Sequence, residues 1–160
     1  PYRQLLNYKE ELVAQSTNDF EKIKRPYVSC YRKLELADKL FLDRDFYTEF
    51  KIEEVKNVIE EFKEYMSNDF NTANAITAIF KVTKLINNYL RERVIRFDAL
   101  LESLKALKSM LWVLGINIEV SPLSQEDKDL VNSWNQAKSV KDFETADKLR
   151  TEITNRHIVL

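Results

Sequence analysis

The scarcity of glycine constrains the fold of this chain more than any other feature. Its 160 residues include one glycine and three prolines. Hairpin turns and phosphate-binding loops depend on glycine, because its backbone adopts conformations that other residues avoid. The sequence therefore predicts an all-α protein of long helices with short polar connections, and it argues against a sheet protein or a glycine-rich nucleotide loop.

Apolar residues recur at steps of three and four along three consecutive stretches, as they do on one face of a helix. This spacing predicts helices over residues 55–66, 73–91 and about 94–114. The sole glycine, Gly115, follows the last of them, where a left-handed residue commonly closes a helix. Together with a helix nearer the N-terminus, these segments predict an antiparallel helical bundle.

The N-terminal helix contains a proline. Asn7 and Glu10 have the spacing of a capping box, and apolar residues then recur at roughly helical spacing as far as Leu34. Pro26 lacks a backbone donor and its ring clashes with the preceding turn, so we expect this helix to be kinked or split near Arg25. The period over residues 37–50 is unclear, which indicates a linker with room for a short helical turn.

The turn over residues 66–75, Met-Ser-Asn-Asp-Phe-Asn-Thr-Ala-Asn-Ala, is the most distinctive run in the chain. Its polar side chains favour turns and helix starts, because they bond to nearby backbone groups. Thr72 is the predicted N-cap, since its hydroxyl can accept from a free backbone N–H of the next turn. Phe70 is expected to pack back into the core and fix the angle between the two helices.

A second and smaller unit follows a break over residues 116–124. Apolar spacing predicts two short helices, around residues 130–137 and 143–153, which form a helical hairpin. The apolar run from His157 to Leu160 can begin a strand, but it has no partner strand in this chain.

The predicted organisation is therefore a bundle over residues 1–115, a linker over 116–124 and a hairpin over 125–160. The first residue is Pro1, which is not a natural start, and we expect the chain to be cut from a longer protein.

Groups that carry out catalysis or bind metals are sparse. His157 and Cys30 are the only residues of their types, which argues against a disulfide framework and a zinc site. The sequence contains no nucleophile elbow and no dinucleotide fingerprint. We therefore expect no catalytic residue and no metal ligand in this segment.

The net charge and the hydropathy of the sequence restrict where in the cell the protein is expected and which partners it is expected to bind. The net charge of −1 argues against a sequence-wide attraction to nucleic acid. No apolar run is long enough to span a membrane, and the N-terminus does not resemble a signal peptide. A lone cysteine suits a reducing compartment, so a cytoplasmic location is expected.

The basic residues are unevenly distributed. Between Phe20 and Leu34, five cations face a single acid, and the same holds between Phe80 and Phe97, whereas the helix near residues 53–64 is acidic. Two such basic segments can present a local phosphate-binding face. The alternative is that these cations pair with the acidic helix or face water, and charge alone leaves both interpretations open.

Four runs, in order and at compatible spacing, resemble the cysteinyl-tRNA synthetases, a family of class I aminoacyl-tRNA synthetases. The runs are Tyr2-Arg3 with Leu6-Asn7-Tyr8 and Glu11-Leu12; Asn68-Asp69-Phe70-Asn71-Thr72 with Ala75; Leu114-Gly115; and Lys141-Asp142-Phe143 with Ala146-Asp147 and Leu149-Arg150.

The resemblance implies a DALR-type anticodon-binding bundle that packs beside a catalytic domain and docks against tRNA, followed by an appendage that helps to read the anticodon. The parent enzyme would use ATP to join cysteine to tRNA(Cys). The ATP, magnesium and zinc sites would lie in an N-terminal catalytic domain that this chain lacks, so no cofactor and no activity are expected of the chain alone. The implied partners are tRNA(Cys) and that domain, and a monomer is expected.

The candidate tRNA-binding residues are cations in the first basic segment and in the hairpin. They are Lys22, Lys24, Arg25, Arg32, Lys33, Lys138, Lys141 and Arg150. The structural motif comprises Asp69, Phe70, Asn71, Thr72 and Gly115.

The chain departs from the family pattern at several positions. Asn68 and Ala73 stand where aspartate and proline are usual, and both changes keep the helix cap. Trp134 and Lys138 stand where arginine is common, so an RNA contact is not carried over to Trp134, although an exposed indole can stack on a base. His157 replaces the glycine that normally ends the last helix.

Two other functions stay open. One is a helical protein-interaction module without an RNA role, in which the acidic and basic helices serve packing or a protein partner. The other is the helical part of a relative that joins cysteine to a sugar amine. Phe70-Asn71 and the signature from Lys141 to Arg150 favour the synthetase.

Overall fold

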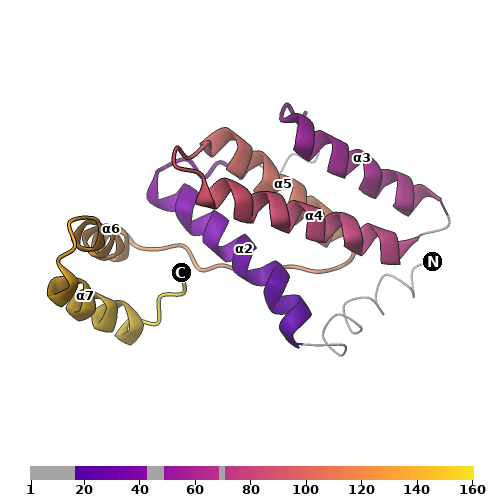
Figure 1. Ribbon diagram of the computed structural model, residues 1–160. Coiled ribbons are helices and arrows are strands. Elements are labelled where there is room, and N and C mark those ends of the chain that lie inside the picture. Colours follow the sequence, from indigo (N-terminus) through magenta and orange to yellow (C-terminus); the bar gives the residue numbers. More distant parts are fainter. Residues whose placement is uncertain (1–16, 43–48, 69–70) are drawn as a thin grey trace. The chain divides into compact units, whose positions relative to one another are not determined.

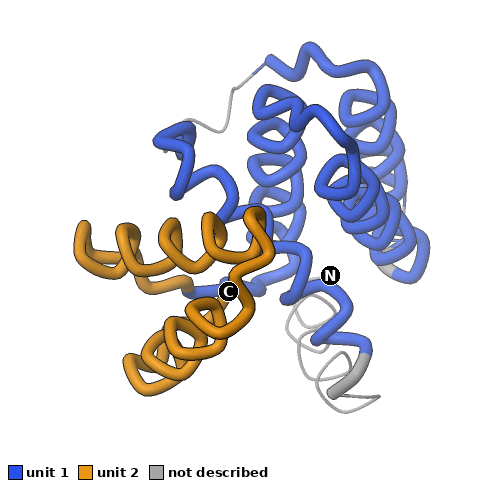
Figure 2. Tube along the Cα trace, turned by 60° about the vertical axis from the view of Figure 1, so that its left-hand side comes forward, with its two compact units in different colours: residues 1–119 blue, residues 120–160 orange. Residues whose placement is uncertain are grey.

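The computed structural model describes residues 17–42, 49–68 and 71–160 (Figure 1). Within these ranges the chain forms six α-helices and no strand, which confirms the predicted all-α fold. The chain divides into two compact units, Pro1–Glu119 and Val120–Leu160 (Figure 2). The capping box predicted at Asn7 and Glu10 lies outside the described residues, as do Asp69 and Phe70.

The first unit is a bundle of four described helices. They are α2 (Thr17–Leu36), α3 (Glu53–Ser67), α4 (Thr72–Arg91) and α5 (Phe97–Val113). Helices α4 and α5 contact each other, and each also packs against both α2 and α3. Their apolar faces meet in a core where Ile23, Ile79 and Leu104 are fully buried. Burial of each such side chain contributes about 1.5–3 kcal/mol, so the core is the main source of stability in this unit.

Helix α2 continues through Pro26, so the predicted split is wrong. A proline in a helix interior costs about 3 kcal/mol, which the surroundings have to offset. Pro26 is itself buried, and Ile23 and Tyr27 beside it are buried against the bundle. The Cys30 thiol also donates to the backbone oxygen of Leu100 at 3.3 Å. Tertiary packing therefore holds the helix together where the local sequence disfavours it.

Helix α4 begins one residue earlier than a Thr72 cap requires. Thr72 is its first helical residue, and the N-cap is Asn71, whose side-chain oxygen accepts from the backbone N–H of Asn74 at 3.3 Å. The Thr72 cap is therefore wrong, and asparagine is at least as good a cap as threonine. The backbone N–H of Asn71 also donates to the backbone oxygen of Tyr65 at 2.8 Å, which ties this cap to the end of α3.

The second unit is a hairpin of α6 (Gln125–Ser139) and α7 (Phe143–Asn155). The side chain of Ser124 caps α6 at 3.1 Å, and that of Asp142 caps α7 at 3.3 Å. Apolar residues of both helices are buried between them. Arg156 joins their outer ends, because its guanidinium donates to Asp127 and Glu126, each at 2.6 Å. Residues 157–160 form no strand.

Gly115 closes α5 as predicted. Its φ is +75°, its N–H donates to the backbone oxygen of Trp112 at 2.9 Å, and the N–H of Ile116 donates to that of Leu111 at 2.8 Å. This pair of bonds is a Schellman motif. Helices α2, α6 and α7 end with the same pair of bonds, and the left-handed residues there are Asp38, Lys141 and His157. His157 thus occupies a position that suits glycine.

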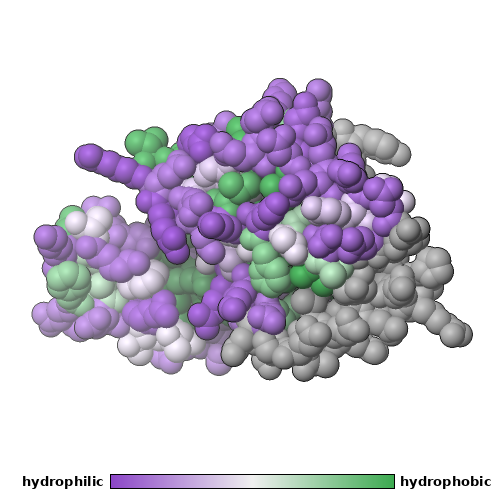
Figure 3. Space-filling view, turned by 45° about the vertical axis from the view of Figure 1, so that its right-hand side comes forward, coloured by the Kyte–Doolittle hydropathy of each residue, from purple (hydrophilic) through white to green (hydrophobic). Residues whose placement is uncertain are grey.

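On the face shown in Figure 3, the described residues are mostly hydrophilic, with apolar side chains in smaller patches between the polar ones. Among the described helices, none combines the length and the apolar character that a membrane span needs.

Candidate nucleic-acid interface

A groove of about 490 Å³ runs between α2 and α4. We call it the basic groove, because its described lining contains four cations and no acidic residue. The cations are Lys22 and Arg25 from α2 and Lys84 and Arg91 from α4. The uncharged polar residues are Ser29, Thr83, Asn87 and Asn88, and Pro26 and Phe80 complete the lining.

Helical spacing explains why these side chains share a groove. On α2, the lining residues 22, 25, 26 and 29 recur at steps of one, three and four, and on α4 the residues 80, 83, 84, 87, 88 and 91 do the same. Residues spaced in this way project from one face of a helix. Helix α2 packs against α4 (Figure 1). The two basic segments, far apart in the sequence, therefore both contribute cations to the groove.

The groove cations are weakly paired. Lys22 approaches Asp19 at 3.7 Å and Arg25 approaches Glu21 at 3.8 Å, with 69% and 83% of the two basic side chains exposed. Ion pairs this long and exposed contribute little, since water screens them. No ion pair joins Lys84 or Arg91 to a described acidic side chain. The positive charge of the groove is therefore available to an anionic ligand.

Two other cations of the second basic segment, Lys81 and Arg96, are paired with acidic residues. Lys81 reaches across to Glu61 of α3 at 2.9 Å, and the hydrogen bond to Glu61 raises the pKa of Lys81. The interpretation that basic residues pair with the acidic helix is thus correct for Lys81. It does not hold for Lys84 and Arg91, which line the groove.

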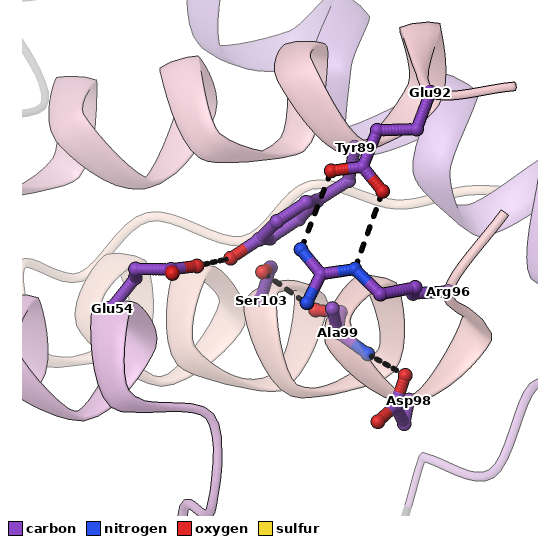
Figure 4. A network of polar contacts seen from close by, with 7 residues as sticks. All are labelled: Glu54, Tyr89, Glu92, Arg96, Asp98, Ala99 and Ser103. Atoms are coloured by element: carbon purple, nitrogen blue, oxygen red, sulfur yellow. Dashed lines mark hydrogen bonds and ion pairs between the residues drawn. The ribbon is translucent and has the colours of Figure 1, made fainter. Parts of the chain in front are cut away.

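Arg96 belongs to a polar network between helices (Figure 4). Its guanidinium lies 4.8 Å from the centre of the Tyr89 ring and bonds to Glu92 at 3.2 Å. The Tyr89 hydroxyl donates to Glu54 of α3. Burial, followed by this bond to Glu54, raises the pKa of Tyr89. The network ties α3 and the residue before α5 to α4, so Arg96 has a structural role.

The structure distributes the predicted cations of α2 unequally. Lys22 and Arg25 line the groove, whereas Lys24 and Lys33 lie outside its lining, with Lys24 half-buried and Lys33 exposed. Arg32 is buried and pairs with Glu35 at 2.9 Å, where the two side chains are only 7% and 6% exposed. Arg32 therefore belongs to the core rather than to an accessible surface.

Two of the three cations predicted in the hairpin lie over one indole. The Lys138 Nζ lies 3.4 Å from the centre of the Trp134 ring, and the Arg150 Cζ lies 5.0 Å from it. Cation–π contacts at exposed sites are worth about 0.5–1 kcal/mol each. Trp134 thus holds two of the three predicted cations, while Lys141 is exposed in its left-handed position after α6.

The sequence interpretation missed part of the groove. Lys84 and Arg91 were noted only as members of a basic segment, and Asn87 and Asn88 were not singled out. The sequence signal that could have found them is their spacing. Residues 84, 87, 88 and 91 recur at steps of three and four, which places them on one face of a helix. Within the described residues, no cluster of three or more His, Cys, Asp or Glu side chains is placed to hold a metal ion.

Comparison with known proteins supports the predicted resemblance. Residues 61–119 match the model of the DALR domain family. The chain is 31% identical over 163 residues to the cysteine–tRNA ligase of Staphylococcus epidermidis and 29% identical over 160 residues to that of Bacillus cereus. Each match covers 99% of this chain and 34% of the relative. No solved structure matches the chain.

The match to the DALR family covers the end of α3 and all of α4 and α5. The α4 side of the basic groove therefore lies inside the segment that matches this family, and its α2 side precedes that segment. The resemblance to cysteinyl-tRNA synthetases that the four motifs predict is confirmed.

Proposed function

We propose that this chain, a relative of the cysteine–tRNA ligases with a DALR domain, is a tRNA-binding region of such a ligase. The observation that carries the proposal is the basic groove, where cations from α2 and α4 converge without an acidic residue in the described lining. We choose tRNA as the partner because the relatives are cysteine–tRNA ligases. The groove offers a basic surface that can bind phosphates.

The chemistry of the groove fits a nucleic-acid backbone. Lysine and arginine neutralise phosphates and release condensed counterions, which gives affinity that falls steeply with salt. Phosphate contacts fix the position of a nucleic acid without reading its sequence. We therefore propose that the groove positions the tRNA. Other contacts would distinguish tRNA(Cys) from other tRNAs, and the candidates for them in the hairpin are Lys138, Lys141 and Arg150.

The whole ligase reaction is a wider proposal, because the chain spans 34% of the length of its relatives. In such an enzyme, cysteine would be joined to tRNA(Cys) with ATP. The resemblance implies that the ATP, magnesium and zinc sites lie in the catalytic domain. The contribution that we propose for this chain is tRNA binding in the cytoplasm.

Binding of tRNA(Cys) transcript over a salt series tests the proposal. Wild-type protein should bind more tightly than the variant with Lys22→Glu, Arg25→Glu and Lys84→Glu. In a plot of the logarithm of the binding constant against the logarithm of the salt concentration, the slope of this variant should be shallower by about two to three. Lys63→Glu, which reverses an exposed lysine of α3 outside the groove lining, is the matched control. An unchanged affinity and slope in the triple variant would overturn the assignment of the groove.

A tRNA of another specificity is the second arm of this experiment. Equal affinity for tRNA(Cys) and an unrelated tRNA at every salt concentration would show that the chain positions tRNA without selecting it. Absence of any tRNA binding, even at low salt, would overturn the proposed function.

A further inference from the structure

We infer that the basic groove recognises the ribose as well as the phosphates of its ligand, and that Asn87 and Asn88 thereby favour the backbone of duplex RNA over that of DNA. This inference rests on the proposed function, because it assumes a nucleic acid in the groove. It adds the mode of contact, through the 2′-hydroxyls of an RNA duplex, and two specificity-determining residues.

The cations of the groove cannot distinguish RNA from DNA. Lys22, Arg25, Lys84 and Arg91 meet phosphates, which are the same in RNA and DNA. A groove lined by these cations alone would bind both nucleic acids with similar affinity. Discrimination needs a group that can bond to the 2′-hydroxyl, since this hydroxyl distinguishes the two backbones.

Asn87 and Asn88 supply such groups. A carboxamide has both a donor and an acceptor, and so has a ribose hydroxyl, which makes the two mutually complementary. Both residues line the groove, with Asn88 exposed and Asn87 half-buried. The hydroxyl of Thr83 is less suited to donate, because it already donates to the backbone oxygen of Phe80 at 2.8 Å.

The order of residues on α4 places the amides between the cations. Lys84 and Arg91 lie about 10 Å apart along the helix axis, at a rise of 1.5 Å per residue, and the two asparagines lie about one turn from each. A backbone strand held by Lys84 and Arg91 through its phosphates would therefore present the intervening sugar to Asn87 and Asn88.

The rest of the described lining offers little for reading bases. Its only aromatic residue is Phe80, which is half-buried, whereas proteins that bind single strands typically stack successive bases on several aromatic side chains. A-form RNA displays its 2′-hydroxyls along a wide and shallow minor groove. The lining thus fits the outside of an RNA duplex better than a splayed single strand.

The test compares the affinities of the intact chain for a labelled RNA duplex and for a DNA duplex of the same sequence. Wild-type protein should bind the RNA duplex more tightly. Asn87→Ala with Asn88→Ala should weaken RNA binding about tenfold, as expected for the loss of one or two hydrogen bonds, and change DNA binding less than about twofold. Asn57→Ala, at an exposed position of α3, is the matched control, and circular dichroism should confirm that the variants fold.

The outcomes separate the inference from the proposed function. Equal binding of RNA and DNA by the wild type, or an equal loss of both in the double variant, would overturn the inference while tRNA binding stands. A wild type that binds neither duplex nor tRNA would overturn both. A carboxamide contact would be supported if the Asn88→Gln variant keeps the preference for RNA and the double alanine variant loses it.

Discussion

The carboxylate of Glu102 on α5 accepts the backbone N–H of Ile52, the N-cap residue of α3, at 2.7 Å. Its other oxygen accepts the backbone N–H of Lys51 at 2.8 Å. The apolar side chain of Ile52 cannot cap its own helix. A residue 50 positions later in the chain therefore satisfies backbone donors at this helix start.

We expect Glu102→Ala to lower the free energy of unfolding by about 1–2 kcal/mol, because two backbone donors lose their partner. Glu102→Gln should lose less, since its side-chain oxygen can still accept one of the two bonds. Urea denaturation measures both effects. Lys108→Ala, at an exposed position of α5, is the control, and a loss in Glu102→Ala no larger than in this control would contradict the capping role.

The Glu102 cap also shows where prediction of the fold from sequence reaches its limit. Helices near residues 55–66 and 73–91 were predictable, because their apolar residues repeat densely with a helical period. The Schellman end at Gly115 was predictable as well, since only glycine adopts that conformation without cost. The Glu102 bonds were not, because they join residues far apart in the sequence, and neither was the continuity of α2 through Pro26, which depends on tertiary packing.

The candidate site was predictable to a similar extent. Lys22 and Arg25 followed from the local excess of basic residues, but their meeting with Lys84 and Arg91 depends on how α2 packs against α4. Arg32 looked equivalent to its neighbours by charge, yet its position in the helical period places it inside the bundle. Charge counts locate a basic segment, and the burial of each side chain decides which cations a ligand can reach.

The burial of Arg32 leads to a second prediction. Arg32→Met should lower the free energy of unfolding by about 3 kcal/mol, because it removes the guanidinium that lies 2.9 Å from the buried carboxylate of Glu35. The double variant Arg32→Met with Glu35→Gln should lose less, since both charges of this buried pair are then removed. At a temperature where both variants are folded, tRNA affinity should match that of the wild type. A selective loss of tRNA binding in a stable Arg32→Met protein would show instead that Arg32 contacts the ligand.

The helix ends provide a third prediction. Lys141 and His157 hold φ values of 60° and 57°, which are strained for residues with a Cβ. Lys141→Gly and His157→Gly should each stabilise the hairpin by about 0.5–1 kcal/mol, as measured by thermal unfolding. Gly115→Ala should do the opposite in the bundle, and its cost should be purely conformational, because an added Cβ would meet nothing within 4 Å. Destabilisation by either glycine variant would contradict the expected relief of strain.

A fourth prediction concerns alkaline pH and the buried face of α2. Burial raises the pKa of the Cys30 thiol from 9.0 to about 12. Burial, with smaller contributions from Tyr31 and Cys30, raises the pKa of Tyr27 from 10.0 to about 12. Both groups keep their protons in the folded bundle at pH values where the unfolded chain releases them. Stability is therefore fully present below about pH 9 and falls as the pH rises towards about 12.

Tyr27→Phe isolates one of these two groups, because it removes the phenolic hydroxyl and keeps the buried ring. The free energy of unfolding, measured in urea between pH 8 and pH 11, should decline less steeply above about pH 10 in this variant than in the wild type, by up to about 1.4 kcal/mol per pH unit. At pH 8 the Cys30 thiol should also resist alkylation until the protein unfolds, since only the thiolate reacts. Identical alkaline slopes in the two proteins would show that Tyr27 does not titrate with unfolding.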